Sequence, residues 1–207
     1  MNADAFDGDS TNVAVMGWLA FEDELPCRPS RVLIAGTSGS GKSTLARRVA
    51  AVLDLPYVEL DALHHATGWT ARAEFLDDVQ ELCAQELWTT EWQYPEARSL
   101  LAARADLFVF LDLPRPLVMA RVVRRTLSRR LRHTNLWGGN VEPPLHTIFR
   151  DPEHIVRWAW RTHAQNARRV ADLAEQQPEL PIVRLTSPGE IQRWVAGRLT
   201  DAGAKRP

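Results

Sequence analysis

The chain has few cysteines and no long apolar run. Cys27 and Cys83 form no CxxC pair, so they predict neither a disulfide framework nor a structural zinc site, and they favour a reducing compartment. The longest uncharged apolar run, residues 13–20, is too short to span a bilayer. The first 27 residues contain neither Lys nor Arg, which is not typical of a signal peptide. Together these absences predict a cytoplasmic protein.

A strong charge imbalance is also lacking. The 207 residues carry a formal net charge of −1, which argues against a dedicated nucleic-acid binder. Hydrophobic residues make up 45% and charged residues 25%, so the composition excludes disorder as the main state and fits one compact domain. Lysine is rare among the basic residues: Lys205 lies in the terminal tail, and Lys42 is the only lysine in the body of the chain.

Residues 1–30 form an acidic stretch in which the first cation is Arg28. We expect an N-terminal extension that is partly disordered. For residues 13–20 within it, docking on the domain surface and disorder are equal alternatives. The structured domain is expected over residues 31–200, with a tail at 201–207.

Apolar periodicity predicts alternating strands and helices. Buried strands are expected at 31–35, 57–60, 88–92, 107–111 and 180–185. Helical patterns fall at 42–53, 75–87, 96–105, 116–132, 151–176 and 187–199. The helix at 151 begins with an Asp-Pro cap, and the last helix begins with a capping box from Ser187 to Glu190. The alternation predicts an α/β fold with a parallel sheet covered on both faces.

A glycine-rich loop joins the first expected strand to the first expected helix. It fits GxxxxGK[ST], a phosphate-binding loop in which successive backbone N–H groups surround a polyphosphate. Lys42 is expected at the β- and γ-phosphates, and the Ser43 hydroxyl at Mg²⁺. The pattern therefore predicts ATP and Mg²⁺ as cofactors, whereas a dinucleotide GxGxxG motif is not matched. The expected nucleotide-binding residues are Gly36, Thr37, Ser38, Gly39, Ser40, Gly41, Lys42, Ser43 and Thr44.

Several segments resemble P-loop kinases of the nucleoside monophosphate kinase type, and most closely the bacterial adenylate kinase-like topology modulation proteins. These segments are GTSGSGKST (36–44), LDALHH (60–65) with Gly68-Trp69, LWTTEWQY (87–94), ARADLFVFLDLPRPLVMARVVRRT (103–126), LWGGN (136–140) and FRDPEHIVRWAWRTH (149–163). The resemblance covers about residues 31–200. It implies a three-layer P-loop NTPase fold with five parallel strands in the order 2-3-1-4-5. It also implies ATP-dependent phosphoryl transfer and a helical, Arg-bearing lid around 115–150.

Seven arginines lie between residues 115 and 132, a stretch without any acid. Helical spacing places Arg121 and Arg125 on one face, and we expect these two to clamp phosphate and to offset charge in the transition state. The alternatives are a solvent-exposed row or a nucleic-acid patch. In the resembled kinases, residues at the position of Ser187 and Pro188 hold the adenine.

Asp61 follows the second expected strand, at the sheet edge where open α/β proteins bind ligands. It is the candidate general base or a ligand of a Mg²⁺-bound water; a turn or helix cap is the alternative. His64 and His65 follow on the expected acceptor-binding segment, and Trp69 is a candidate wall of that pocket. A His pair without a third ligand at suitable spacing is weak support for a metal site.

Besides Asp61, a second acidic residue is expected beside the P-loop strand, and two residues are candidates for it. Asp112 ends an apolar strand as in a Walker B motif, but in the resembled kinases the acid beside the P-loop strand comes from the third strand. Relatives usually read DGNY there, and this chain reads Glu91-Trp92-Gln93-Tyr94. We therefore expect Glu91 to reach the metal water and the acceptor, and Asp112 to cap the next helix. The replacement of Asp-Gly-Asn leaves the acceptor open.

These observations predict an ATP-dependent phosphotransferase, an adenylate kinase-like P-loop kinase that acts on a small-molecule acceptor, a nucleotide or a nucleoside. The alternatives are a non-catalytic ATP-binding regulatory protein and a DNA-directed ATP-binding protein. Neither a nucleic-acid nor a membrane partner is expected, and no oligomeric state is implied.

Overall fold

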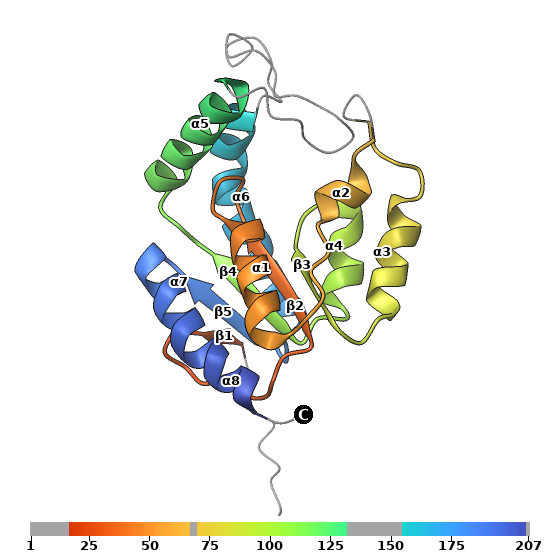
Figure 1. Cartoon of the computed structure of the whole chain (residues 1–207), viewed down its shortest axis with the longest axis vertical. Helices are drawn as coiled ribbons and strands as arrows, with labels where there is room; N and C mark the ends of the chain where they lie inside the picture. Colours follow the sequence, from red (N-terminus) through yellow and green to blue (C-terminus); the bar gives the residue numbers. More distant parts are fainter. Residues whose placement is uncertain (1–16, 67–69, 132–154, 206–207) are drawn as a thin grey trace, which may run out of the picture.

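The computed structural model describes residues 17–66, 70–131 and 155–205. Its centre is a five-stranded sheet in the order β1-β5-β4-β2-β3, in which all neighbouring strands are parallel (Figure 1). The strands are β1 (Trp18–Leu19), β2 (Arg31–Gly36), β3 (Trp88–Glu91), β4 (Leu107–Leu111) and β5 (Ile182–Leu185). The expected parallel α/β architecture is confirmed.

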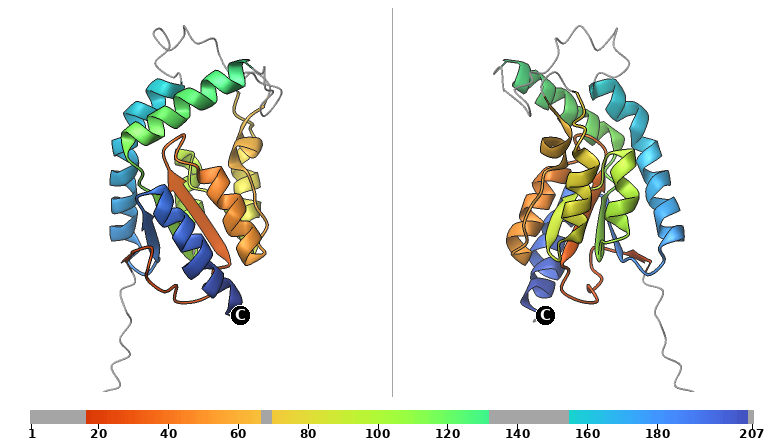
Figure 2. Two further views of the ribbon diagram at one scale, coloured as in Figure 1. Left: turned by 60° about the vertical axis from the view of Figure 1, so that its left-hand side comes forward. Right: turned by 90° about the vertical axis from the view of Figure 1, so that its right-hand side faces the viewer.

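Helices cover both faces of this sheet (Figure 2). They are α1 (Lys42–Leu53), α2 (Leu60–His64), α3 (Phe75–Ala84), α4 (Pro95–Ala102), α5 (Arg115–Leu131), α6 (Ile155–Gln176), α7 (Pro188–Trp194), a π-helix (Val195–Leu199) and α8 (Thr200–Ala204). No helix within the described ranges is both long and apolar enough to cross a membrane.

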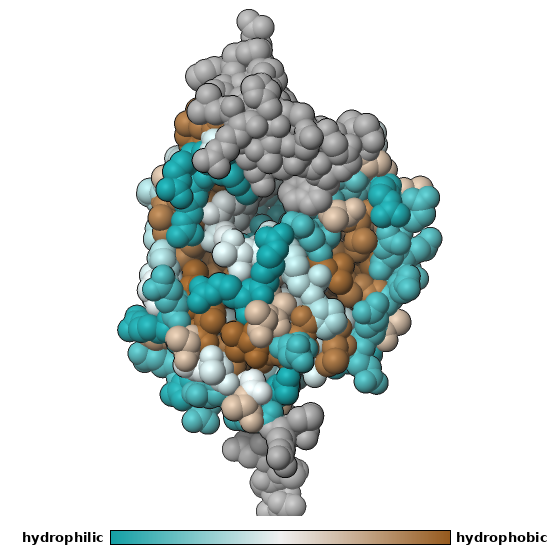
Figure 3. Space-filling view, viewed as in Figure 1, coloured by the Kyte–Doolittle hydropathy of each residue, from teal (hydrophilic) through white to brown (hydrophobic). Residues whose placement is uncertain are grey.

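Strand β2 shows why the sheet needs a helical layer on each side. Val32 and Ile34 pack with α1 and the C-terminal helices, whereas Leu33 and Ala35 pack with α3, α4 and α6. Successive side chains of a strand point to opposite faces, and all four of these are buried. The apolar run therefore serves two cores. On the face shown in Figure 3, apolar residues appear as separate patches among polar ones.

The expected second strand is the main difference from the sequence-based prediction. Over 57–60 the structure has one parallel bridge, from Tyr57 to Thr89, and Leu60 already begins α2. Leu60 is fully buried, so its packing is satisfied in a helix and the strand is not extended. The bridge lies beside β3, at the predicted edge. The order of the other four expected strands agrees with the prediction.

The described part of the predicted N-terminal extension packs on the domain. Trp18 and Leu19 add β1 to the edge of the sheet by pairing with Ile182 and Val183 of β5. Leu25 is buried, and its carbonyl oxygen accepts a hydrogen bond of 2.8 Å from Lys205 Nζ. The predicted tail at 201–207 begins inside α8.

Helices α5 and α6 pack against each other at the end of the molecule that carries the P-loop (Figure 2). Helix α5 belongs to the predicted lid region around 115–150, whereas α6 begins after it. The segments LWGGN and FRDP, including the Asp-Pro cap at 151, lie outside the described residues. The predicted cap of the last helix is present, since Ser187 Oγ accepts from Glu190 N at 3.2 Å. The Glu190 carboxylate bonds Thr186 N at 2.7 Å and not the Ser187 backbone.

Candidate active site

The glycine-rich loop connects β2 to α1, as its sequence predicts. Gly39 has φ +85°, and a Cβ there would lie 2.3 Å from Val122 Cγ2 of α5. Gly41 has φ +100°, and a Cβ there would meet nothing within 4 Å. Positive φ and close approach explain the glycine at 39. At 41 the backbone conformation alone requires it, and the space beside the loop stays open.

The N-terminus of α1 carries no acidic side chain of its own. Gly41 is its N-cap and provides no side-chain hydrogen bond, and the first turn contains no acidic residue. The first backbone N–H groups of a helix lack intrahelical acceptors and favour bound anions. This end of α1 can therefore receive phosphate groups.

Lys42 lies in the first turn of α1, in the field of two carboxylates. Burial lowers the pKa of Lys42, while the charges of Glu91 and Asp61 raise it and those of Arg125 and Arg98 lower it. Four charged side chains from four other segments thus act on the Lys42 ammonium group. This convergence brings together Lys42, Asp61 and Arg125, which sequence analysis had selected separately.

Glu91, the last residue of β3, is 1% exposed. Its Oε1 accepts a hydrogen bond of 2.7 Å from the Tyr57 hydroxyl, and its Oε2 is buried without a hydrogen-bond partner. Burial and the nearby Glu91 charge raise the pKa of Tyr57, so this phenol stays a donor. A buried carboxylate oxygen with no partner is costly unless it meets a cation or a water.

Asp112 is bonded to an arginine of the neighbouring strand. Its Oδ2 accepts a hydrogen bond of 2.9 Å from Arg184 Nε, on the neighbouring strand β5, and helix α5 begins only at Arg115. Glu91, and not Asp112, is therefore the strand-end acid that influences Lys42.

Asp61 lies in α2 and is held by two residues that follow β3. Gln93 Nε2 and the Tyr94 hydroxyl donate to the same oxygen, Oδ1, over 2.7 and 2.6 Å. Burial and the charge of Asp61 raise the pKa of Tyr94. Gln93 and Tyr94 thus orient the candidate base from the segment in which this chain departs from DGNY.

His64 and His65 flank Tyr94. The His64 ring stacks on the Tyr94 ring with centroids 3.9 Å apart, and His65 Nε2 lies 3.1 Å from the Tyr94 hydroxyl. Phe75 meets the His64 ring edge-on at 4.8 Å. Both histidines are therefore grouped with Asp61, whereas Trp69 lies outside the described residues. No group of three or more His, Cys, Asp or Glu able to hold a metal is found in the described part of the chain.

Two arginines of α5 contact the P-loop. Arg121 Nη1 donates to the Ser40 carbonyl over 3.2 Å, and Arg125 Nη2 donates to Ser38 Oγ over 3.1 Å. Arg124, between them, is exposed. The structure thus places the two arginines chosen by helical spacing beside the loop.

Asn166 of α6 also reaches the loop, through a hydrogen bond of 3.3 Å from its Nδ2 to Thr37 Oγ1. The sequence analysis did not select Asn166, Gln93, Tyr94 or Tyr57 as individual site residues. The segments that resemble the kinase family contain only the two after β3. For the contact between Asn166 and Thr37, 129 residues apart, no local pattern is available.

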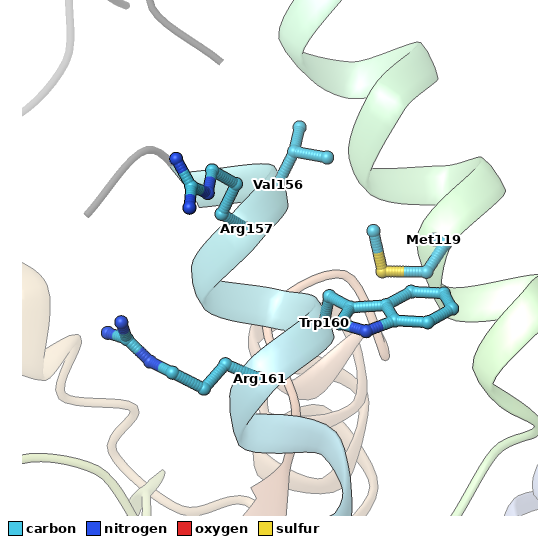
Figure 4. Close-up of a pocket in the computed structure, with 5 residues that line it drawn as sticks. All are labelled: Met119, Val156, Arg157, Trp160 and Arg161. Carbon is cyan, nitrogen blue, oxygen red and sulfur yellow. The ribbon is translucent and has the colours of Figure 1, made fainter. Parts of the chain in front are cut away.

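A separate hollow of about 360 Å³ lies between α5 and α6. Met119, Val156 and Trp160 line it together with Arg157 and Arg161, whose guanidinium groups point away from Met119 (Figure 4). Arg115 lies over the Trp160 ring at 4.8 Å. None of these residues contacts the P-loop in the interactions described above.

Comparisons with known proteins show that the sequence of this chain is similar to those of kinases. It is 35% identical over 130 residues to the cytidylate kinase of Thermus thermophilus, an alignment that covers 58% of this chain and 59% of that protein. It is 48% identical over 58 residues to a bifunctional pantoate ligase/cytidylate kinase of Synechococcus, covering 26% of this chain and 11% of that protein. The chain thus spans less than two thirds of the length of these relatives. No family model matches it.

Two solved structures are similar in outline. A gluconokinase from Sinorhizobium meliloti aligns with a TM-score of 0.46 and 20% identity, over 85% of this chain and 95% of that one. A shikimate kinase from Acinetobacter baumannii aligns with a TM-score of 0.41 and 15% identity, over 84% and 88%. The fold assignment rests on the strand order and the P-loop described above.

Proposed function

We propose that this chain is an ATP-dependent P-loop kinase that transfers the γ-phosphoryl group of ATP to a small-molecule acceptor, a nucleotide or a nucleoside. One observation carries the proposal: Asp61 and Glu91 act on the same ammonium group, that of Lys42 in the phosphate-binding loop. The similarity to cytidylate kinases supports it.

The loop and the two arginines of α5 supply the ATP side. The N–H groups at the start of α1 and the Lys42 ammonium bind the β- and γ-phosphates. Arg121 and Arg125, now bonded to loop oxygens, lie where they can exchange these acceptors for phosphate oxygens. Ser187 and Pro188, after β5, are proposed to lie beside the adenine.

The residues also fit Mg²⁺. Glu91 Oε2 is buried with no hydrogen-bond partner, and carboxylate oxygens suit this ion, often through bound water. Ser43, next to Lys42, is proposed as the hydroxyl ligand, and Asp61 as a further contact through water. When bound, Mg²⁺ supplies charge neutralisation on the phosphate oxygens.

Asp61 is proposed to serve the acceptor. With an acceptor hydroxyl, Asp61 takes its proton while the oxygen bonds to the γ-phosphorus and the bond to the ADP oxygen breaks. Gln93 and Tyr94 fix the carboxylate for this step, because both donate to Oδ1. His64, His65 and Trp69 are proposed as further acceptor contacts, and Glu91 as a contact between the two halves of the site.

The test is ATP consumption across nucleoside, nucleotide and sugar acceptors, together with the ATP-induced melting shift. Lys42→Ala is expected to abolish both; Lys205→Ala removes the other lysine, far from the P-loop, and serves as the control. ATP binding without turnover of any acceptor above the Lys42→Ala background would favour a non-catalytic ATP-binding protein. Salt-sensitive duplex binding that survives Lys42→Ala would favour a DNA-directed role. An unchanged melting shift in Lys42→Ala would refute the assigned nucleotide site.

A further inference from the structure

The backbone of Tyr57 is fixed beside β3. Tyr57 forms a parallel bridge to Thr89, and hydrogen bonds run from Val58 N to the Thr89 carbonyl over 3.0 Å and from Thr89 N to the Pro56 carbonyl over 2.8 Å. Side chains of a strand alternate between the faces of the sheet, so Thr89 and Glu91 share a face, and Tyr57 opposite Thr89 shares it too. Diagonal neighbours on one face lie within reach of an aromatic side chain. The bridge therefore brings the Tyr57 hydroxyl to Glu91.

The Tyr57 ring is held from the side of α1. It is partly buried against the core that α1 shares with the sheet, and the Arg47 guanidinium of α1 lies 5.0 Å from the ring centroid. Arg47 in turn donates to Glu59 over 3.3 Å, so it is tied to the segment that carries Tyr57. Burial and the charge of Glu91 raise the pKa of Tyr57, so the hydroxyl keeps its proton. Ring and proton are therefore both held for one acceptor, Glu91 Oε1.

The two carboxylate oxygens of Glu91 have different surroundings. Oε1 accepts the hydrogen bond of 2.7 Å from Tyr57, whereas Oε2 is buried with no hydrogen-bond partner among the described residues. A glutamate side chain has several rotatable bonds, so its carboxylate needs an external contact to stay in one position. The bond from Tyr57 provides this contact at one oxygen and leaves the other for a cation. The charge of Glu91 already acts on the Lys42 ammonium group.

We propose that Tyr57 is a positioning residue, whose hydroxyl holds Glu91 Oε1 so that Oε2 is available to Mg²⁺ or its bound water at the phosphate site. The inference rests on the proposed function, in which Glu91 is assigned to Mg²⁺. It adds that the metal affinity of the site depends on the segment before α2 as well as on β3. Tyr57 acts through Glu91 and is assigned no contact of its own with ATP or the acceptor.

The experiment uses Tyr57→Phe, which removes the hydroxyl and keeps the ring beneath Arg47. On the full chain, this variant is expected to raise the Mg²⁺ concentration needed for half of the ATP-induced melting shift by about 3- to 10-fold, the effect of one hydrogen bond. Each shift is measured against the variant's own melting temperature without ATP, so a general loss of stability does not contribute. Calorimetry with ATP and Mg²⁺ below the melting temperatures repeats the comparison on folded protein. An unchanged or lowered Mg²⁺ requirement overturns the proposal.

Thr90→Val is the matched control for a purely structural effect. The Thr90 hydroxyl is also buried and joins the same two segments, but it donates to the Val58 carbonyl, over 2.7 Å, and not to Glu91. Thr90→Val is therefore expected to lower the melting temperature and to leave the Mg²⁺ requirement unchanged. Equal increases of the Mg²⁺ requirement in Thr90→Val and Tyr57→Phe would show a structural effect and overturn the proposal.

The double variant tests whether Tyr57 acts through Glu91. In a Glu91→Gln background, Tyr57→Phe is expected to raise the Mg²⁺ requirement no further, whereas the same increase as in the wild-type background overturns the proposal. If Glu91→Gln alone leaves the Mg²⁺ requirement unchanged, the assignment of Glu91 to Mg²⁺ fails and the inference fails with it. If only Tyr57→Phe has no effect, the inference alone fails. A Mg²⁺ requirement that depends on Tyr57 in a protein that phosphorylates no acceptor supports the inference and overturns the proposed kinase activity.

Discussion

The Tyr94 hydroxyl lies 2.6 Å from Asp61 Oδ1, although 33 residues separate the two in the chain. The Tyr94 backbone is unusual for an aromatic residue, with φ +60° and ψ +112°. Helix α4 begins at the next residue, so the turn delivers the side chain to Asp61 and the backbone into the helix. Strained conformations of this kind cluster at functional sites.

Tyr94→Phe is expected to reduce kcat/KM by about 10- to 100-fold, because it removes one hydrogen bond to a charged carboxylate. The ring remains, so its stacking with His64 and the melting temperature should change little. Steady-state kinetics with any accepted acceptor measures the loss. The ATP-induced melting shift is the internal control, since Asp61 is assigned to the acceptor; a shift that falls in parallel would contradict this assignment.

Glu91→Gln is expected to raise the Mg²⁺ concentration needed for the ATP-induced melting shift by about tenfold, within the range for outer-sphere metal partners. Asp112→Asn is the matched comparison. Asp112 also ends a strand, but it is bonded to Arg184. If Asp112→Asn raised the Mg²⁺ concentration needed for the melting shift and Glu91→Gln did not, Asp112 and not Glu91 would be the metal-binding acid.

Local signals explain what the sequence predicted well. Helix α1 has the predicted bounds of 42–53 and β4 those of 107–111, because each is a strong apolar pattern with clear ends. The P-loop was recognisable because its motif needs specific residues at fixed spacing. Arg121 and Arg125 could be selected because helical periodicity is itself local.

Contacts between distant segments were not predictable in the same way. The stretch 57–60 has a β-strand pattern, yet tertiary packing places Leu60 in a helix and leaves one bridge at Tyr57. The bonds from Asn166 to Thr37 and from Tyr57 to Glu91 join residues 129 and 34 positions apart. No periodicity encodes such pairs, since they depend on how the helices lie across the sheet.

Gly39→Ala is expected to lower the unfolding free energy by about 2–4 kcal/mol, the sum of positive-φ strain and overpacking. The added Cβ would lie 2.3 Å from Val122 Cγ2 and 3.1 Å from the Val118 carbonyl oxygen. Chemical denaturation measures the change. Gly197→Ala is the control, because a Cβ there meets nothing within 4 Å and the residue is helical. Equal losses of unfolding free energy in Gly39→Ala and Gly197→Ala would show that a Cβ at position 39 is not crowded.

The stability of the fold should depend on pH through His65. Burial and the neighbouring His64 lower the pKa of His65 below its ordinary value of 6.5, although Asp61 raises it. The folded state therefore favours the neutral ring. As the pH falls below about 6.5, the unfolded chain takes up this proton first and stability decreases. Denaturation of wild type and His65→Gln between pH 7.5 and 5.5 tests this: the wild type should lose more stability, and parallel curves would contradict the prediction.

The arginines of α5 offer a test within a single helix turn. Arg121→Gln and Arg125→Gln are expected to lower kcat by about 100- to 1,000-fold, the usual effect of removing a donor that meets developing transition-state charge. Arg124→Gln removes the same charge from an exposed position between them, so its kcat should stay near that of the wild type. Because all three variants change the net charge equally, a long-range electrostatic effect predicts the same small loss in each. Steady-state kinetics at low and high salt separates the two explanations: only contact with the transferring phosphate makes Arg124→Gln differ from its neighbours at both salt concentrations.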